Sequence, residues 1–293
     1  MGKKFKGCTL ERQDSWYKAH RESFEAGRVY EPFLRTDDVP SHGIKSKVPH
    51  FRDARRLVHV LSLNELWMYL HLANNPFVID VYEQYAIPLD ASLAIADMLE
   101  VKHPVYADTR VPIVQTIDFM ARMINPETGE ESLKAFPVKQ PEDAQKLRTA
   151  QKLALQEGYC RLEDIEYELI TSDVLRTVHS QNLDTLYRHR ELSVFLGRVA
   201  KRWLPNFFGA LSDDRHARAA HLVERASIAT GVNYETGVSI FYNALWHKQI
   251  SFNWSQYLRL EKAASDLGLG AHAAWYHSAR VRTRSEPCCG SRR

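Results

Sequence analysis

An acidic residue and a lysine in one predicted hairpin have the types and spacing for metal-assisted chemistry on a phosphate. Asp118 lies among apolar residues, and Lys139 follows 21 residues later, beyond a polar segment with turn residues. If the turn is centred between Glu127 and Thr128, cross-strand partners have numbers that sum to 255, which places Asp118 opposite Pro137. Lys139 is then a diagonal neighbour on the same face, because strand side chains alternate.

The residues alone leave two interpretations of this acid open. An Asp in an apolar strand is costly to bury unless it is paired or binds a cation. One interpretation is a salt bridge to Lys139. The other is a divalent-metal site, in which carboxylates hold Mg²⁺ while the lysine orients or deprotonates a water and stabilises charge on a phosphate. Glu65 is the candidate second carboxylate, although with Ser62 it also matches the S-x-x-E capping box at a helix start.

The remaining text predicts an α/β region followed by a helical one. Apolar spacing and end signals favour helices over residues 9–27, 63–73 and 141–157. Strand text occupies FVIDVYEQYAIP, the two arms of the hairpin and YELIT at 167–171. After Ser172 the text is helical, with a short wing-like segment from Ile250 to Asn253, which is typical of a winged-helix or helix-turn-helix module and equally of a helical bundle.

Composition excludes several classes of protein. With 293 residues, 44% hydrophobic and 26% charged, the chain has room for roughly two globular domains and is not of a disordered type. No apolar run has the length of a membrane span, and the N-terminal lysines lack the apolar core of a signal peptide, so a cytoplasmic protein is expected. The four cysteines lack zinc spacing, phosphate-binding glycine motifs are absent, and the net charge of +3 comes from an arginine-rich C-terminal tail.

Seven blocks, in order over some 110 residues, resemble the N-terminal domain of the TnsA-type endonuclease, a subunit of heteromeric cut-and-paste transposases with a restriction-endonuclease-like PD-(D/E)XK fold. They are YEPFL, VPSHG, RRLVHVLSLNELWMYLHL, VIDVYEQYAIPL, KHP, TIDFM and FPVK. The resemblance covers residues 28 to 171. Motif by motif, it implies that Glu65 and Asp118 are the catalytic acids and that Lys139 is the catalytic lysine.

One position departs from the family pattern. Family members usually have Glu or Gln two residues before the lysine, where it lends an oxygen to the metal, whereas this chain has Pro137. Mg²⁺ keeps several waters and needs few protein ligands, so we expect Glu65, Asp118 and a backbone carbonyl such as that of Val138 to hold it. A weaker site completed by another carboxylate and a nuclease that has lost activity are the alternatives.

The resemblance implies a function and a set of partners. The expected activity is Mg²⁺-dependent hydrolysis, with Mn²⁺ as a substitute, of the phosphodiester at the 5′ ends of a transposon. The expected partners are transposon-end DNA, a transposase subunit with its own carboxylate active site, and an AAA+ ATPase regulator. The rival functions are an inactive scaffold that links transposase and regulator, and a stand-alone restriction-type nuclease.

The expected architecture has four parts. Residues 1–27 form an N-terminal helix and basic arm, and residues 28–175 form an α/β catalytic domain with a mixed sheet flanked by helices. Residues 176–270 form a helical, winged-helix domain, and residues 271–293 form a basic tail without regular structure.

Overall fold

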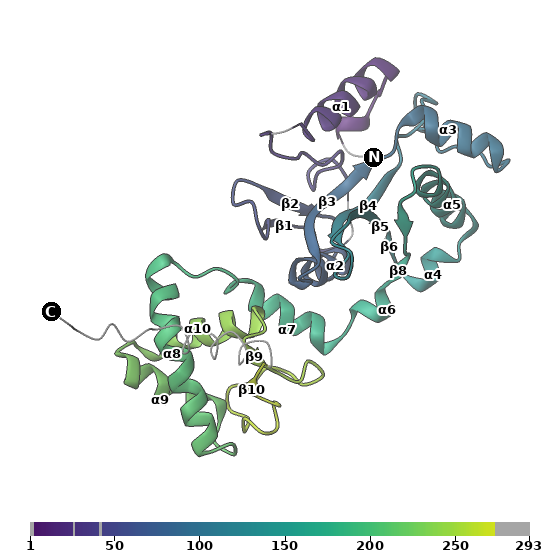
Figure 1. Ribbon diagram of the computed structural model, residues 1–293. Coiled ribbons are helices and arrows are strands. Elements are labelled where there is room, and N and C mark those ends of the chain that lie inside the picture. Colours follow the sequence, from purple (N-terminus) through teal and green to yellow (C-terminus); the bar gives the residue numbers. More distant parts are fainter. Residues whose placement is uncertain (1–2, 26, 41–42, 273–293) are drawn as a thin grey trace. The chain divides into compact units, whose positions relative to one another are not determined.

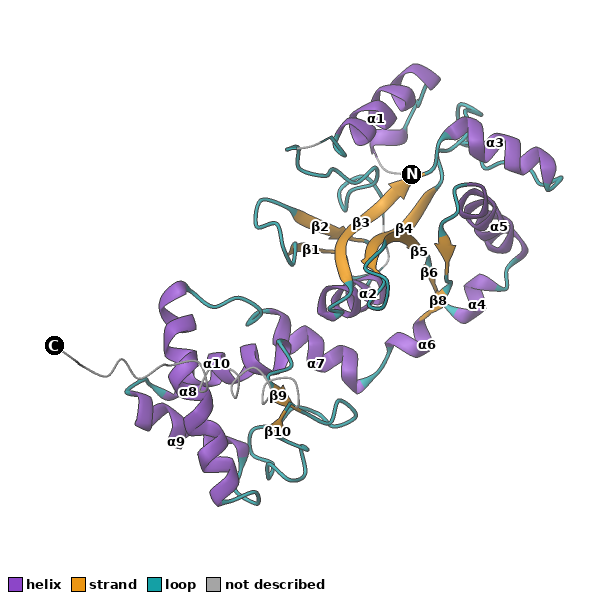
Figure 2. Ribbon diagram, in the orientation of Figure 1, coloured by secondary structure: helices purple, strands orange, loops and turns teal. Residues whose placement is uncertain are grey.

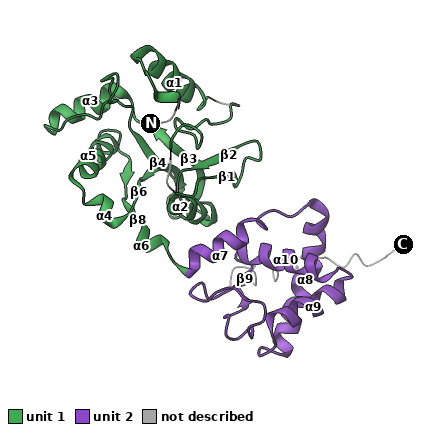
Figure 3. Cartoon of the chain, turned by 180° about the vertical axis from the view of Figure 1, so that it is seen from behind, with its two compact units in different colours: residues 1–177 green, residues 178–293 purple. Residues whose placement is uncertain are grey.

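The chain folds into two compact units. A computed structural model describes residues 3–25, 27–40 and 43–272, so almost all of the expected basic tail lies outside the described residues. Unit 1 comprises residues 1–177 and unit 2 comprises residues 178–293 (Figures 1 and 3).

A mixed four-stranded sheet forms the centre of unit 1. Its order is β3 (Val78–Ala86), β4 (Thr116–Ile124), β5 (Glu131–Phe136) and β7 (Glu166–Tyr167). The first three strands are antiparallel and β7 is parallel to β5. Buried apolar residues from these strands supply both faces of the sheet, and helices therefore cover it on both sides.

Helices on the two faces pack against different strand residues. On one face, the Tyr69 ring of α2 (Leu63–Asn74) stacks on Phe119 with 6.4 Å between ring centroids. On the other, α3 (Leu89–Met98) and α5 (Leu147–Leu162) share a buried core cluster with the strands. Figure 1 shows α2 and α5 on either side of the sheet. The remaining elements of unit 1 are η1 (Lys3–Phe5), α1 (Leu10–Glu22), β1 (Ser46–Pro49), β2 (Leu57–Val60), β6 (Val138–Lys139), α4 (Pro141–Ala144), β8 (Ile170–Thr171) and α6 (Ser172–Leu175).

The predicted hairpin register is confirmed. Phe119 pairs with Phe136 and Ile124 pairs with Glu131, so the numbers of paired residues sum to 255. The ladder ends one step before Asp118, because Pro137 has no backbone N–H to donate. Pro137 thus separates β5 from β6, which pairs with β8 in a second, two-stranded sheet.

Two elements that were predicted to be continuous are each divided into two in the structure. The single strand expected at 167–171 is divided into β7 and β8, opposite the break at Pro137: the Ile170 N–H donates to the Pro137 carbonyl, but the proline returns no hydrogen bond. The single helix expected at 141–157 is divided into α4 and α5, because Lys146 takes an extended backbone conformation (ψ 128°).

Unit 2 is mainly helical (Figure 2). Its helices are α7 (Val178–Tyr187), α8 (Val194–Asp213), α9 (Ala219–Thr230) and α10 (Tyr234–Trp246), packed around buried aromatic side chains that include Trp203. The wing-like segment forms β9 (Ile250–Ser251), which pairs with β10 (Gly270–Ala271). Across the described part of the chain, no helix has both the length and the apolar character to cross a membrane.

Candidate functional site

Asp118, Val138 and Lys139 meet at the break in the β4–β5 ladder. Because Pro137 interrupts the strand, the Val138 N–H donates to Asp118 Oδ2 at 2.7 Å in place of a backbone partner. Lys139 Nζ donates to the same oxygen at 2.6 Å and to the Val138 carbonyl at 2.9 Å. The predicted acid–lysine contact is therefore confirmed, and it is the salt bridge of the simpler interpretation.

Glu65 lies in the first turn of α2. The Ser62 hydroxyl accepts a hydrogen bond from the Glu65 N–H and donates one to Glu65 Oε1 at 3.0 Å, while the Leu61 N–H donates to Oε2 at 2.8 Å. The predicted helix cap is thus confirmed in the hydroxyl half of the capping box. The Glu65 carboxylate itself is buried.

A third polar side chain, which sequence reasoning left without a role, contacts Glu65 from the sheet. Gln84 Nε2 lies 3.5 Å from Glu65 Oε2, and Gln84 Oε1 accepts a hydrogen bond from Thr116 Oγ1 at 3.1 Å. The signal in the sequence was a polar pair, Glu83 and Gln84, between the tyrosines of a buried strand.

The pKa of Glu65 shows that its carboxylate and that of Asp118 interact and that their negative charge is not fully balanced. Burial, together with the negative charge of Asp118, raises the pKa of Glu65 to about 7. Burial alone would lower the pKa of Lys139, but the charge and hydrogen bond of Asp118 outweigh it, and the pKa of the ammonium is raised. Lys139 is therefore a fixed cation, which disfavours the expectation that it deprotonates a water.

The donor set fits a hard divalent cation. Two carboxylates and a peptide carbonyl are oxygen ligands of the kind that Mg²⁺ takes, and Mg²⁺ uses only one or two carboxylates with waters. Within the described ranges, no cluster of three or more His, Cys, Asp or Glu side chains suited to a metal occurs. Glu65, Asp118 and the Val138 carbonyl are the residues that would hold the ion.

Positive charge borders the site on α5. Lys152 and Arg148 are exposed and lie one helical turn apart. Partial burial lowers the pKa of Lys152, and the charges of Arg148 and Lys139 lower it further. One turn beyond, the Gln156 amide donates to the Thr116 carbonyl at 2.7 Å, which attaches this helix face to the start of β4. Over the described residues, Lys152 has no acidic partner.

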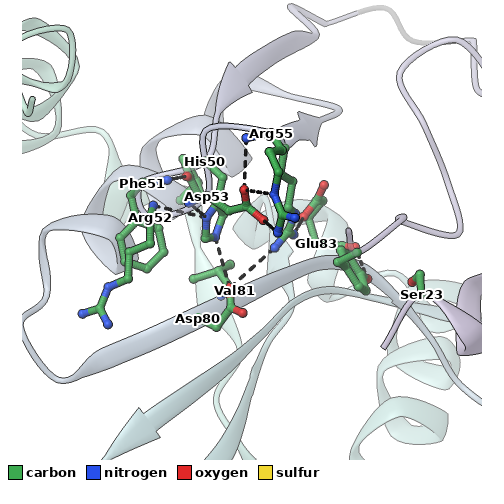
Figure 4. Close-up of polar contacts among 12 residues, drawn as sticks. Ser23, His50, Phe51, Arg52, Asp53, Arg55, Asp80, Val81 and Glu83 are labelled. Atoms are coloured by element: carbon green, nitrogen blue, oxygen red, sulfur yellow. Dashed lines mark hydrogen bonds and ion pairs between the residues drawn. The ribbon is translucent and has the colours of Figure 1, made fainter. Parts of the chain in front are cut away.

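A second buried charged cluster, which we call the Arg56 network, adjoins the first along β3. The Arg56 guanidinium forms an ion pair with Glu83 and lies 4.4 Å from the centre of the Tyr30 ring. It also lies 3.5 Å from Asp80, whose carboxylate contacts His50 Nε2 at 3.2 Å (Figure 4).

The mixed sheet flanked by helices fits a restriction-endonuclease-like fold, with two acids and a lysine gathered beside a broken strand edge. Residues 75–172 match the family described as TnsA-like endonuclease N terminal. This match supports a TnsA-type endonuclease domain in that segment of the chain.

A curated relative extends the match. The chain is 29% identical over 161 residues to the Transposon Tn7 transposition protein TnsA of Escherichia coli. The matched region covers 55% of this chain and 57% of the relative, so the chain spans little more than half the length of that protein.

Proposed function

We propose that this protein is the metal-dependent DNA endonuclease subunit of a heteromeric transposase, and that it hydrolyses the phosphodiester at the 5′ ends of the transposon during excision. The convergence of Glu65, Asp118 and Lys139 at the sheet edge carries the proposal. The similarity to a transposition protein supports it.

The protein's own residues divide the work. Glu65, Asp118 and the Val138 carbonyl hold the divalent ion, Mg²⁺ or Mn²⁺, which when bound supplies Lewis-acid polarisation of the phosphate and an activated water. Lys139 is held at Asp118 and stabilises the negative charge that develops on the phosphate. Lys152 and Arg148 attract the flanking backbone phosphates.

The partners belong to the same proposal. A transposase subunit with its own carboxylate active site cuts and joins the 3′ ends, and an AAA+ ATPase regulator docks on the helical domain of residues 176–270, for which we propose a winged-helix character. Residues 28–175 act as the catalytic domain, and the complex works on transposon-end DNA in the cytoplasm.

Strand-resolved cleavage of labelled transposon-end DNA tests the proposal. The protein is assayed with the transposase and regulator in Mg²⁺ and in Mn²⁺, beside Asp118→Ala. The expected result is 5′-strand cleavage that is lost in the variant while 3′ cleavage remains.

Two other outcomes identify the rival functions. If the wild-type protein never cuts the 5′ strand and 3′ cleavage still proceeds, the protein is an inactive scaffold. Efficient cutting of unrelated DNA without the partner subunits identifies a stand-alone nuclease.

A further inference from the structure

Gln84 joins the candidate metal site from the strand next to Asp118. Its side chain is 2% exposed and spans the gap between Glu65 on α2 and Thr116 at the start of β4. The amide NH₂ faces Glu65 and the amide oxygen accepts from the Thr116 hydroxyl. The hydroxyl thereby anchors the oxygen end of the amide. This is the orientation that an ionised Glu65 holding a cation would require, because a carboxylate accepts hydrogen bonds and donates none.

The sheet register places Gln84 directly beside Asp118. Glu83 pairs with Phe119 and Tyr85 with Ile117, so Gln84 and Asp118 occupy the intervening cross-strand position. Pro137 occupies the position on the opposite side of Asp118, one step beyond the β4–β5 ladder. Asp118 is thus flanked on one side by Pro137, which has no side-chain oxygen, and on the other by Gln84, which has a side-chain amide.

The backbone at Gln84 is unusual for its residue type. Its φ of 50° lies in the left-handed region, which non-glycine residues adopt uncommonly and which concentrates at functional sites. The register continues across it without a shift, but the alternation of side chains does not: Tyr82 and Tyr85, three residues apart, both pack on one core cluster. The irregular conformation therefore changes which side chains face α2.

We propose that Gln84 is a positioning residue of the metal site: it holds the Glu65 carboxylate in place for the ion and so compensates for the oxygen ligand that Pro137 cannot supply. This inference rests on the proposed function. Gln84 acts through Glu65, with Thr116 fixing its amide.

Metal binding by the full-length protein tests the inference apart from cleavage. Mn²⁺ is titrated into wild type, Gln84→Gly, Thr116→Val and the double variant, and free Mn²⁺ is read from its electron paramagnetic resonance signal. Glycine suits a φ of 50°, so Gln84→Gly removes the amide while relieving the backbone. Thr116→Val keeps the shape of the side chain and removes only the hydroxyl.

The expected loss is in metal affinity and not in folding. Gln84→Gly weakens Mn²⁺ binding by about 10- to 100-fold, the range seen when residues that orient metal ligands are removed. The protein stays folded during the titration, because relief of the positive φ offsets part of the packing lost with the side chain. Thr116→Val has a smaller effect, and the double variant is no weaker than Gln84→Gly, because both substitutions remove the same contact to Glu65.

Gln115→Ala is the matched control, since its buried amide donates to the Ile113 carbonyl and not to the site. Two results would overturn the inference and leave the proposed function standing. One is equal weakening of Mn²⁺ binding in the control. The other is unchanged Mn²⁺ binding in Gln84→Gly, measured beside a wild type that binds Mn²⁺ and cleaves DNA. A wild type that neither binds Mn²⁺ nor cleaves overturns the inference together with the proposed function.

Discussion

Glu83 and Gln84 are neighbours in β3, yet they belong to two different buried polar clusters. Glu83 is fully buried and forms an ion pair with Arg56, and its Oε1 accepts a hydrogen bond from the His59 N–H. Gln84 contacts Glu65, which receives hydrogen bonds from a backbone N–H, a hydroxyl and an amide. In the described part of the chain, no ion pair involves Glu65.

The location of the cation distinguishes the clusters. In the Arg56 network the guanidinium side chain is 4% exposed and contacts the buried acid directly. In the candidate site the Lys139 side chain is 27% exposed and contacts Asp118, so Glu65 faces a like charge. The first cluster is fully paired and links the segment from His50 to Arg56 to the sheet. In the second, Glu65 has no cationic partner among the described residues, and the lysine side chain is partly exposed.

Lys139→Ala is expected to have the largest effect. Loss of the cation that faces the phosphate lowers the cleavage rate by about 1,000-fold. The fold is retained at a lower melting temperature, because Asp118 loses its cation but keeps the hydrogen bond from the Val138 N–H. Single-turnover cleavage and thermal unfolding measure the two effects. Lys134→Ala is the control, since Lys134 pairs with Glu166 and Glu168 at the far edge of the sheet. Retained cutting by Lys139→Ala would count against the assignment.

Glu83→Leu should act mainly on stability, whereas Lys139→Ala acts mainly on cleavage. It leaves the Arg56 guanidinium buried without its main partner, which costs about 3–5 kcal/mol of unfolding free energy. Urea unfolding measures this loss. Glu131→Leu, which breaks an exposed pair with Arg122, should cost about 1 kcal/mol or less. Equal losses of unfolding free energy in the two variants would show that the buried Arg56–Glu83 pair contributes no more to stability than the exposed pair.

In the metal-free protein, the Glu65 carboxyl, which has no ion-pair partner among the described residues, should make the free energy of unfolding depend on pH. Its folded pKa, about 7, is above the ordinary value of 4.5, so the folded state binds the proton more tightly. This contribution to stability is fully present below about pH 4.5 and is lost as pH rises through about 7, a loss of about 3 kcal/mol.

Chemical denaturation in EDTA at pH 5 and pH 8 measures this loss. Glu65→Gln is the reference, because an amide does not titrate, and its stability should fall less between the two pH values. The same difference in both proteins would mean that the pKa of Glu65 is not raised in the folded protein.

Lys152→Ala should have the smallest effect. Removal of one phosphate contact weakens DNA binding a few-fold and reduces the slope of log affinity against log salt by about 1, while cleavage at saturating DNA is unchanged. Fluorescence anisotropy over a salt series measures the slope. Lys146→Ala is the control, since Lys146 already pairs with Asp143 at 2.6 Å. An unchanged slope in Lys152→Ala would remove α5 from the DNA surface.

Local patterns in the sequence determined much of this protein. Alternation and turn residues were sufficient to predict the hairpin register, and with it the contact between Asp118 and Lys139. The capping signal at Ser62 placed Glu65 in the first turn of a helix. These predictions succeeded because each depends on hydrogen bonds between residues that are near in sequence or joined by one short turn.

Only the tertiary structure decided which distant groups meet and what charge they carry. The approach of Glu65 to Asp118, and with it the raised pKa of the glutamate, depends on how α2 packs against the sheet. The left-handed conformation that brings Gln84 to Glu65 has no local signal, because a glutamine in strand text predicts ordinary alternation. Burial and the mutual proximity of charges arise from the packing of the whole unit.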